Sequence, residues 1–395
     1  MKKTLIAVAA AAALATSSAF AEITFGAWLR VLAAPIASDG DEVRAGMTNS
    51  WGYGARTARI DINAVSEDGK AGFAMGVFND VDGIGMGDRA SMWVKPVDML
   101  KISVGKYDSP DNGLRGDFTY GSWNWLRPYN WGYDGEGLTF DGIWRKGLML
   151  ELDPVEGLHI FAVIPMETDF SRTAENTYRN TQVGFGYSIE GVGRIKAQWI
   201  GDWQYTTDTD DDPDEDMTTG QFGVAFDLTA VENLYVTIGG RFGIADKDYE
   251  EGAKYVKAAV TAGVSYQVTE EFKVSVDGGF KMFQDKCVGK ADDLDDKLFF
   301  VGAGIDYALM DGLTATADVR FMNTGYGKDG DDNSISFMIG INKSVSSNGS
   351  LGIAFQGATN GCGFSNNALA GYVDAPAAKS DEFVWAIPVS VSVWF

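Results

Sequence analysis

The stretch FVWAIPVSVSVWF, Phe383 to Phe395, alternates apolar residues with small or polar ones. In an extended strand, side chains two residues apart point to the same side. One face therefore carries Phe383, Trp385, Ile387, Val389, Val391, Val393 and Phe395, and the other carries Ala386, Pro388, Ser390, Ser392 and Trp394. The pattern predicts a strand with one continuous apolar face and an aromatic last residue.

The same alternation recurs along the chain. It begins with 23–33, is broken by an expected loop over 35–54, and returns from residue 58 onward. Short turn-like segments separate the later strands at 66–70, 95–99, 153–157, 190–193, 229–233, 268–271, 309–312 and 344–349. These short turns alternate with longer polar segments. The layout predicts an all-β, transmembrane, antiparallel up-and-down β-barrel with short periplasmic turns and long outer loops.

The predicted barrel has 18 strands, which is an even number and places both termini on the short-turn side. Sixteen strands is the alternative, because the short segments 89–95, 147–152 and 158–165 are the least secure of the predicted strands. A soluble sandwich or jelly roll also alternates with period 2. It would not explain the strict alternation of long and short connections.

The first residues, MKKTLIAVAAAAALATSSAFAE, combine two lysines, a short apolar run and the small-residue site Ala19-Phe20-Ala21. This is the pattern of a secretory signal peptide, 1–21, with cleavage expected after Ala21. No later apolar run approaches the roughly 20 residues that a membrane-spanning helix needs. Residues 22–395 are therefore expected to form a single barrel domain.

Composition narrows the classes of partner. The net charge of −23 makes nucleic acid an unexpected partner, because nucleic-acid binding requires a basic surface. A mean hydropathy of −0.09 fits a membrane barrel, in which lipid-facing and lumen-facing residues balance along each strand.

With the signal peptide, the alternating connections and the terminal Val389–Phe395, the chain resembles the Gram-negative general diffusion porins. The resemblance implies a bacterial outer-membrane location, contact with membrane lipid and a homotrimer. It also implies that the barrel-assembly machinery reads the strand ending at Phe395, and that 383–395 pairs with 23–33 to close the sheet. Closure would remove the free edges that lipid cannot satisfy.

The segment 109–146 joins the expected fifth and sixth strands, where porins fold a loop into the pore. It is rich in aromatic and charged residues, and a loop so aromatic would hardly stay solvated. The candidate residues for the pore constriction in this loop are Arg115, Asp117, Arg127, Trp123, Trp125 and Trp131. Across the lumen, the candidates are Arg30, Arg59 and Arg241, opposite acidic wall residues, which together would create a transverse field that weights ion passage.

Other features point to loops. Cys287 and Cys362 fall in expected outer loops, where the oxidising compartment permits a disulfide but does not require one. The acidic run 206–219 lacks a calcium-binding pattern, because Pro213 and Thr219 stand where Gly and Glu are needed. We read it as a solvated acidic loop that divalent cations can bridge to lipopolysaccharide phosphates.

The sequence offers no catalytic constellation, no metal-ligand set and no cofactor motif. His159 is the only histidine and is expected at the periplasmic end of a strand, so we expect the protein not to be an enzyme. The predicted function is a water-filled channel for passive diffusion of small hydrophilic solutes and ions. Two alternatives stay open: a porin selective for a substrate such as a sugar, which would stack on the aromatic loop, and a surface structural or adhesive barrel.

Overall fold

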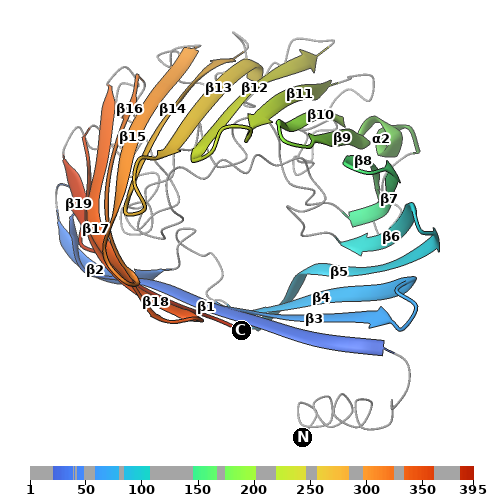
Figure 1. Ribbon diagram of the computed structural model, residues 1–395, viewed down its shortest axis with the longest axis horizontal. Coiled ribbons are helices and arrows are strands. Elements are labelled where there is room, and N and C mark those ends of the chain that lie inside the picture. The colour runs from blue at the N-terminus through green and yellow to red at the C-terminus, as the bar shows by residue number, and fades with distance from the viewer. Residues whose placement is uncertain are drawn as a thin grey trace, which may run out of the picture.

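The strands of this computed structural model form one antiparallel ring (Figure 1). The structure describes residues 21–38, 40, 42–48, 58–79, 84–106, 146–166, 174–201, 219–245, 256–283, 297–323, 333–359 and 383–395. The ring is the barrel that the alternating sequence predicts.

The first part of the wall contains β1 (Ala21–Ser38), β2 (Val43–Thr48), β3 (Ala58–Ser66), β4 (Ala71–Asn79), β5 (Ile84–Val97), β6 (Leu100–Lys106), β7 (Lys146–Val155) and β8 (Leu158–Pro165). The second part contains β9 (Gln182–Ile189), β10 (Gly193–Gly201), β11 (Thr219–Leu228), β12 (Leu234–Ala245), β13 (Val256–Gln267) and β14 (Phe272–Phe283). The last part contains β15 (Lys297–Met310), β16 (Leu313–Met322), β17 (Ser334–Ser346), β18 (Gly349–Ala358), β19 (Val384–Ala386) and β20 (Val389–Trp394).

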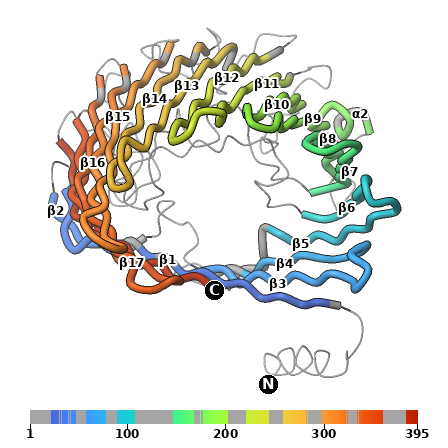
Figure 2. Tube along the Cα trace, viewed as in Figure 1, coloured from blue at the N-terminus to red at the C-terminus, as the bar shows by residue number. Residues whose placement is uncertain are grey.

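The first and last strands close the ring. β1 pairs with β20 from Trp28 opposite Trp394 to Ala33 opposite Val389. At the seam, Phe395 N–H donates to the carbonyl of Ala27 at 2.7 Å, and Ala27 N–H donates to the carbonyl of Phe395 at 2.9 Å. The blue and red ends of the chain therefore lie side by side in Figure 2. The predicted closure partner is confirmed.

The predicted number of strands is wrong, because the barrel has 20 strands rather than 18 or 16. All three doubtful segments are strands, so the excess has another cause. β3 pairs with β1 over 21–29 and β2 pairs with the same edge of β1 over 32–38, within the segment expected to be a loop. At the other end, Ile387 and Pro388 separate β19 from β20, since proline has no N–H for the ladder. β2 and β3 therefore share the wall position on one side of β1, and β19 and β20 share the position on its other side.

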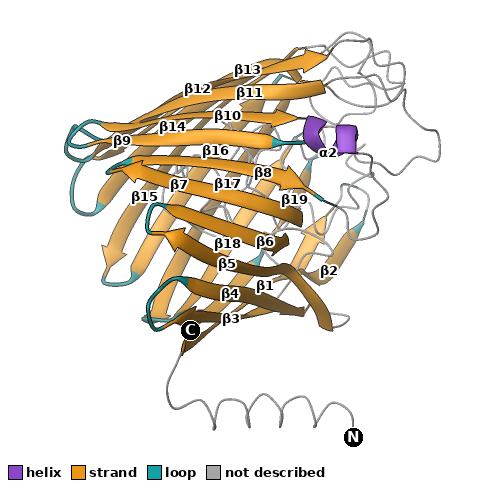
Figure 3. Ribbon diagram, turned by 90° about the vertical axis from the view of Figure 1, so that its right-hand side faces the viewer, coloured by secondary structure: helices purple, strands orange, loops and turns teal. Residues whose placement is uncertain are grey.

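Short connections gather at one end of the barrel. Described turns join each odd-numbered strand from β3 to β17 to the even-numbered strand that follows it. They lie at the sites that the sequence predicts. Figure 3 shows these turns together at one end, which we call the turn end, and α2 (Ala174–Arg179) at the opposite end. Among the described residues, no helix is long and apolar enough to span a membrane.

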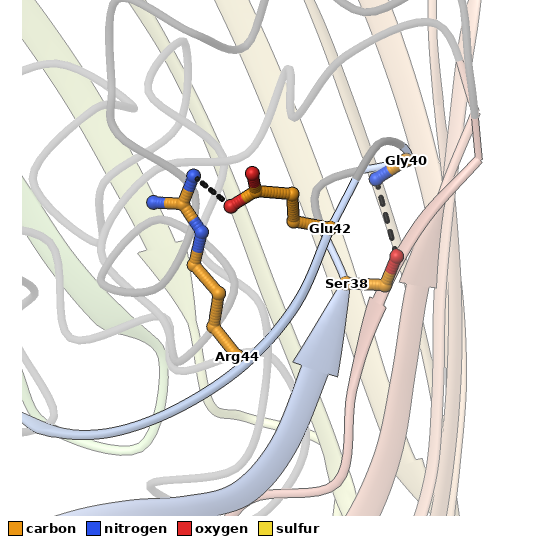
Figure 4. Close-up of polar contacts among 4 residues, drawn as sticks. All are labelled: Ser38, Gly40, Glu42 and Arg44. Carbon is orange, nitrogen blue, oxygen red and sulfur yellow. Dashed lines mark hydrogen bonds and ion pairs between the residues drawn. The ribbon is translucent and has the colours of Figure 1, made fainter.

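The connection between β1 and β2 lies at the end opposite the turn end. Gly40, at a φ of 101° that favours glycine, donates its N–H to Ser38 Oγ at 3.2 Å. Beside it, Arg44 Nη2 lies 3.0 Å from Glu42 Oε2, with both side chains more than half exposed (Figure 4). This ion pair is at the rim, where solvent weakens it.

The wall has an inverted distribution of polarity. Side chains alternate along each strand, so β14 presents Val276 at 51% exposure but Asp277 at 2%. The ring is a single layer, with no described strand outside it to cover outward side chains (Figure 1). The buried members therefore face inward and the exposed ones face outward. Apolar side chains form the outer surface, and most of the polar side chains lie on the inner surface together with some buried apolar ones such as Phe161 and Val163, as in membrane barrels.

The terminal strand follows the same rule. Ser390 and Ser392 are buried and face inward, whereas Val391 is 45% exposed on the outer face. The two faces deduced from the alternation of Val389–Phe395 are confirmed.

Candidate pore wall

Lys196, Asp227 and Thr237 form a polar cluster on the inner face of β10, β11 and β12. Lys196 Nζ lies 2.6 Å from Asp227 Oδ2, and the hydroxyl of Thr237 donates to Asp227 Oδ1 at 2.7 Å. All three side chains are buried. An isolated charge would be very costly there, and the contacts compensate both charges of the pair.

A second set of charges lies across β14, β15 and β16. Arg320 Nε is 3.2 Å from Asp318 Oδ1. A Cβ placed on Gly302 would lie 2.7 Å from Asp277 Oδ1 and 3.3 Å from Arg320 Cγ. The glycine therefore leaves the space in which an aspartate from one neighbouring strand and an arginine from the other converge. Two residues before Asp318 on β16, the hydroxyl of Thr316 donates to Asp306 Oδ1 on β15 at 2.9 Å.

A third set lies near the turn end, on β5, β6 and β7. The ammonium groups of Lys95 and Lys101 are 5.8 Å and 5.7 Å from the ring centroid of Trp93, within cation–π range. Lys101 Nζ also lies 2.8 Å from the buried carboxylate of Glu151. This part of the inner wall combines an aromatic ring with basic groups and remains partly exposed.

The structure places two of the predicted wall arginines on the inner face. Arg59 Nε lies 2.6 Å from Asp61 Oδ1, with the Arg59 side chain 13% exposed. Arg241 is buried in β12. The backbone of Arg30 pairs with that of Ser392 in the closing seam, and the Arg30 side chain lies outside the described part of the structure.

The predicted loop residues Arg115, Asp117, Arg127, Trp123, Trp125 and Trp131 lie outside the described residues, as do Cys287 and Cys362.

Other inward residues were not singled out from the sequence. They include Trp93 and three glutamines of β9, β10 and β11, namely Gln182, Gln198 and Gln221. Part of the signal was present in the alternation, because Trp93 lies between the outward Met92 and Val94, and Gln182 and Gln221 each precede an outward apolar residue. Neutral amides carry neither the charge nor the aromatic ring that marks a pore residue in the sequence.

His159 lies at the start of β8, close to the turn between β7 and β8, where the sequence predicts it. Its Nδ1 is 2.7 Å from Asp153 Oδ1. No group of three or more potential metal ligands occurs within the described ranges. This pair is therefore a local contact near the turn end.

Comparisons with known proteins show the fold. No family model matches the chain, and no curated protein matches it. OmpT, an outer membrane protein of Vibrio cholerae in its trimer form, is similar with a TM-score of 0.51 and 14% identity, covering 95% of this chain and 99% of OmpT. An anion-selective porin from Comamonas acidovorans gives a TM-score of 0.47 and 12% identity, covering 95% and 100% of the two chains. A mutant of Rh. blastica porin gives 0.47 and 14%, with the same coverage. The chain has the porin-like β-barrel fold of outer-membrane proteins.

Proposed function

We propose that this protein forms a water-filled channel in the bacterial outer membrane, through which small hydrophilic solutes and ions diffuse passively. The observation that carries the proposal is the inverted wall, with charged and polar side chains inside the closed ring and apolar ones outside. The outer surface suits hydrocarbon, and the antiparallel ring pairs the strand edges internally.

The inner charges support an aqueous passage. Arg59 and Lys101 are partly exposed on the inner wall beside the carboxylates of Asp61 and Glu151, and water or a polar solute can complete the solvation of these charged groups. Diffusion needs no chemical step, so wall and loop residues would act by selecting solutes and not by catalysis.

The remaining parts of the proposal come from the sequence. The signal peptide 1–21 would direct export, Phe395 would present the last strand to the barrel-assembly machinery, and 109–146 would narrow the pore. The barrel would assemble as a homotrimer, with acidic outer loops facing lipopolysaccharide.

Planar-bilayer recording tests the proposal. Residues 22–395, refolded and added to a bilayer, should produce discrete conductance steps. In a salt gradient, Arg241→Gln should shift the reversal potential toward cation preference, because it removes an inward positive charge from β12. Arg44→Gln is the matched control, since Arg44 is exposed at the rim and paired with Glu42, and it should shift the potential less. Refolded protein that inserts without conductance steps would rule out the channel.

A further inference from the structure

Three glutamine side chains converge on the inner wall at β9, β10 and β11. Gln182 and Gln221 both pair in register with Ile200, and Gln198 is two residues from Ile200 on the same face of β10. Their exposures are 1%, 1% and 2%, respectively, for Gln182, Gln221 and Gln198. The three amides therefore surround one position of the wall and are shielded from bulk water.

These amides have unused hydrogen-bonding capacity. Within the described part of the chain, no partner is present for Gln182 Nε2, or for either side-chain polar atom of Gln198 and Gln221. Buried polar groups in native proteins are nearly always paired, and an unpaired amide costs free energy. Three adjacent unpaired amides on one surface point to a hydrogen-bonding guest.

An apolar patch adjoins the amides. Met149, Phe161 and Val163 belong to one buried cluster on the inner face of β7 and β8. Val163 pairs in register with Gln182, and the Phe161 ring lies over Gly184, whose added Cβ would be 2.8 Å from it. Because Gly184 also pairs with Gln198, the ring is one strand away from the second amide. Together these side chains make a surface that is apolar on one side and amide-bearing on the other.

We propose that Gln182, Gln198, Gln221 and the adjoining Phe161 form a subsite for a neutral, hydroxyl-rich solute such as a small saccharide. Gln198 and Gln221 each offer an unpaired donor and an unpaired acceptor, and Gln182 offers an unpaired donor. This set matches hydroxyl groups, which both donate and accept. The aromatic side takes the apolar C–H face of a sugar ring. No ligand charge is required, because the nearby Lys196 is neutralised by Asp227 at 2.6 Å. This inference rests on the proposed channel function.

The shielding of the subsite also predicts its kinetics. The amides are only 1% to 2% exposed, so binding requires a rearrangement that makes them accessible, which lowers the association rate below the diffusion limit. Once the solute is bound, bulk water does not compete with its hydroxyl groups for the amides. Binding should therefore appear as resolved interruptions of the current and not only as a smooth reduction.

The experiment uses refolded residues 22–395 in a planar bilayer, with sucrose as the probe. Polyethylene glycol of similar size, which carries ether acceptors and few hydroxyl donors, is the control solute. Sucrose should cause resolved interruptions that the glycol does not. Gln182→Leu, Gln198→Leu and Gln221→Leu should each weaken the sucrose blocking constant by about 2- to 10-fold. Gln356→Leu is the matched control, because Gln356 is an equally buried glutamine of β18, and it should leave blocking unchanged.

Folding is checked for each variant by its heat-dependent electrophoretic mobility. Where a leucine variant fails to fold, Gln198→Asn, which keeps the amide but withdraws it by one methylene, should still weaken blocking. A conducting channel with equal responses to sucrose and the glycol would overturn the subsite and leave the channel function standing. Equal loss of blocking in Gln356→Leu would also overturn the subsite. Absence of conductance in the unmodified chain would instead refute the channel.

Discussion

Lys196 Nζ on β10 and Asp227 Oδ2 on β11 lie 2.6 Å apart, and their side chains are only 0% and 4% exposed. Lys196→Met leaves the carboxylate buried without its cation, so we expect a loss of about 3–5 kcal/mol in the free energy of unfolding. Lys196→Met with Asp227→Leu removes both charges and should recover most of this loss, although Thr237 then loses its acceptor. Urea unfolding in lipid vesicles measures both values. A double variant as unstable as the sum of the two single variants would show that the two charges are not coupled.

Gly184 is a position where the wall has no room for a side chain. An added Cβ would lie 2.8 Å from Phe161 and 2.9 Å from the carbonyl oxygen of Ala197, closer than normal contact. Gly184→Ala should therefore destabilise the barrel by about 1–3 kcal/mol. Gly240→Ala in β12 is the matched control, because its nearest contact would be 3.4 Å away. Vesicle unfolding compares them, and equal stability of the two variants would contradict the close packing.

Two changes at Phe395 distinguish the contribution of its backbone from that of its side chain. Deleting Phe395 removes its two hydrogen bonds with Ala27, each worth about 0.5–1.5 kcal/mol net, whereas Phe395→Ala keeps them. The side chain is 79% exposed, so Phe395→Ala should refold in vesicles nearly as well as the unmodified chain.

In cells, the deletion of Phe395 and Phe395→Ala should reduce barrel assembly to a similar extent. Both variants lack the aromatic ring that the assembly machinery is proposed to recognise. The fraction of heat-modifiable barrel in outer-membrane preparations measures this. Normal assembly of Phe395→Ala in cells would argue against that recognition.

Asp68, in the exposed turn between β3 and β4, should titrate at a lower pH than an ordinary aspartate. Its pKa is lowered by the hydroxyl of Ser66, which donates to Oδ1 at 2.6 Å, and by the N–H of Lys70 at 3.0 Å. A carboxyl group with a lowered folded pKa stabilises the native turn above its unfolded pKa of about 3.9, and the contribution disappears as the pH falls through the folded pKa. Ser66→Ala should raise the pKa of Asp68, as measured from its carboxyl carbon shift by NMR. An unchanged titration would contradict the assigned cause.

The sequence predicts the barrel and the short turns because both follow from the alternating stretches and the short segments between them. The closing pair is implied by the resemblance to porins. The number of strands does not follow from alternation. Pro388 divides the last wall position, and β2 lies in a segment whose Gly and Asp residues favour a loop. Which segments share one edge of β1 depends on pairing between strands, which no local pattern encodes.

For the candidate wall, the sequence predicts which residues face inward but not which of them contact one another. Alternation places Arg59 and Arg241 inward, and the structure confirms this. It does not predict that Arg59 pairs with Asp61, or that the amides of Gln198 and Gln221 lie together without partners. Those relationships depend on the register between neighbouring strands.

The pairing of β1 with β20 has a consequence for how the molecule is made. One edge of the first strand must wait for residues 384–394, which are synthesised after all the other described strands, before it gains its permanent neighbour. Contacts so distant in sequence form slowly, and an unpaired strand edge can meanwhile associate with other chains. A chain that stops before residues 384–394 keeps that edge open, so the ring can close only after these residues have been made.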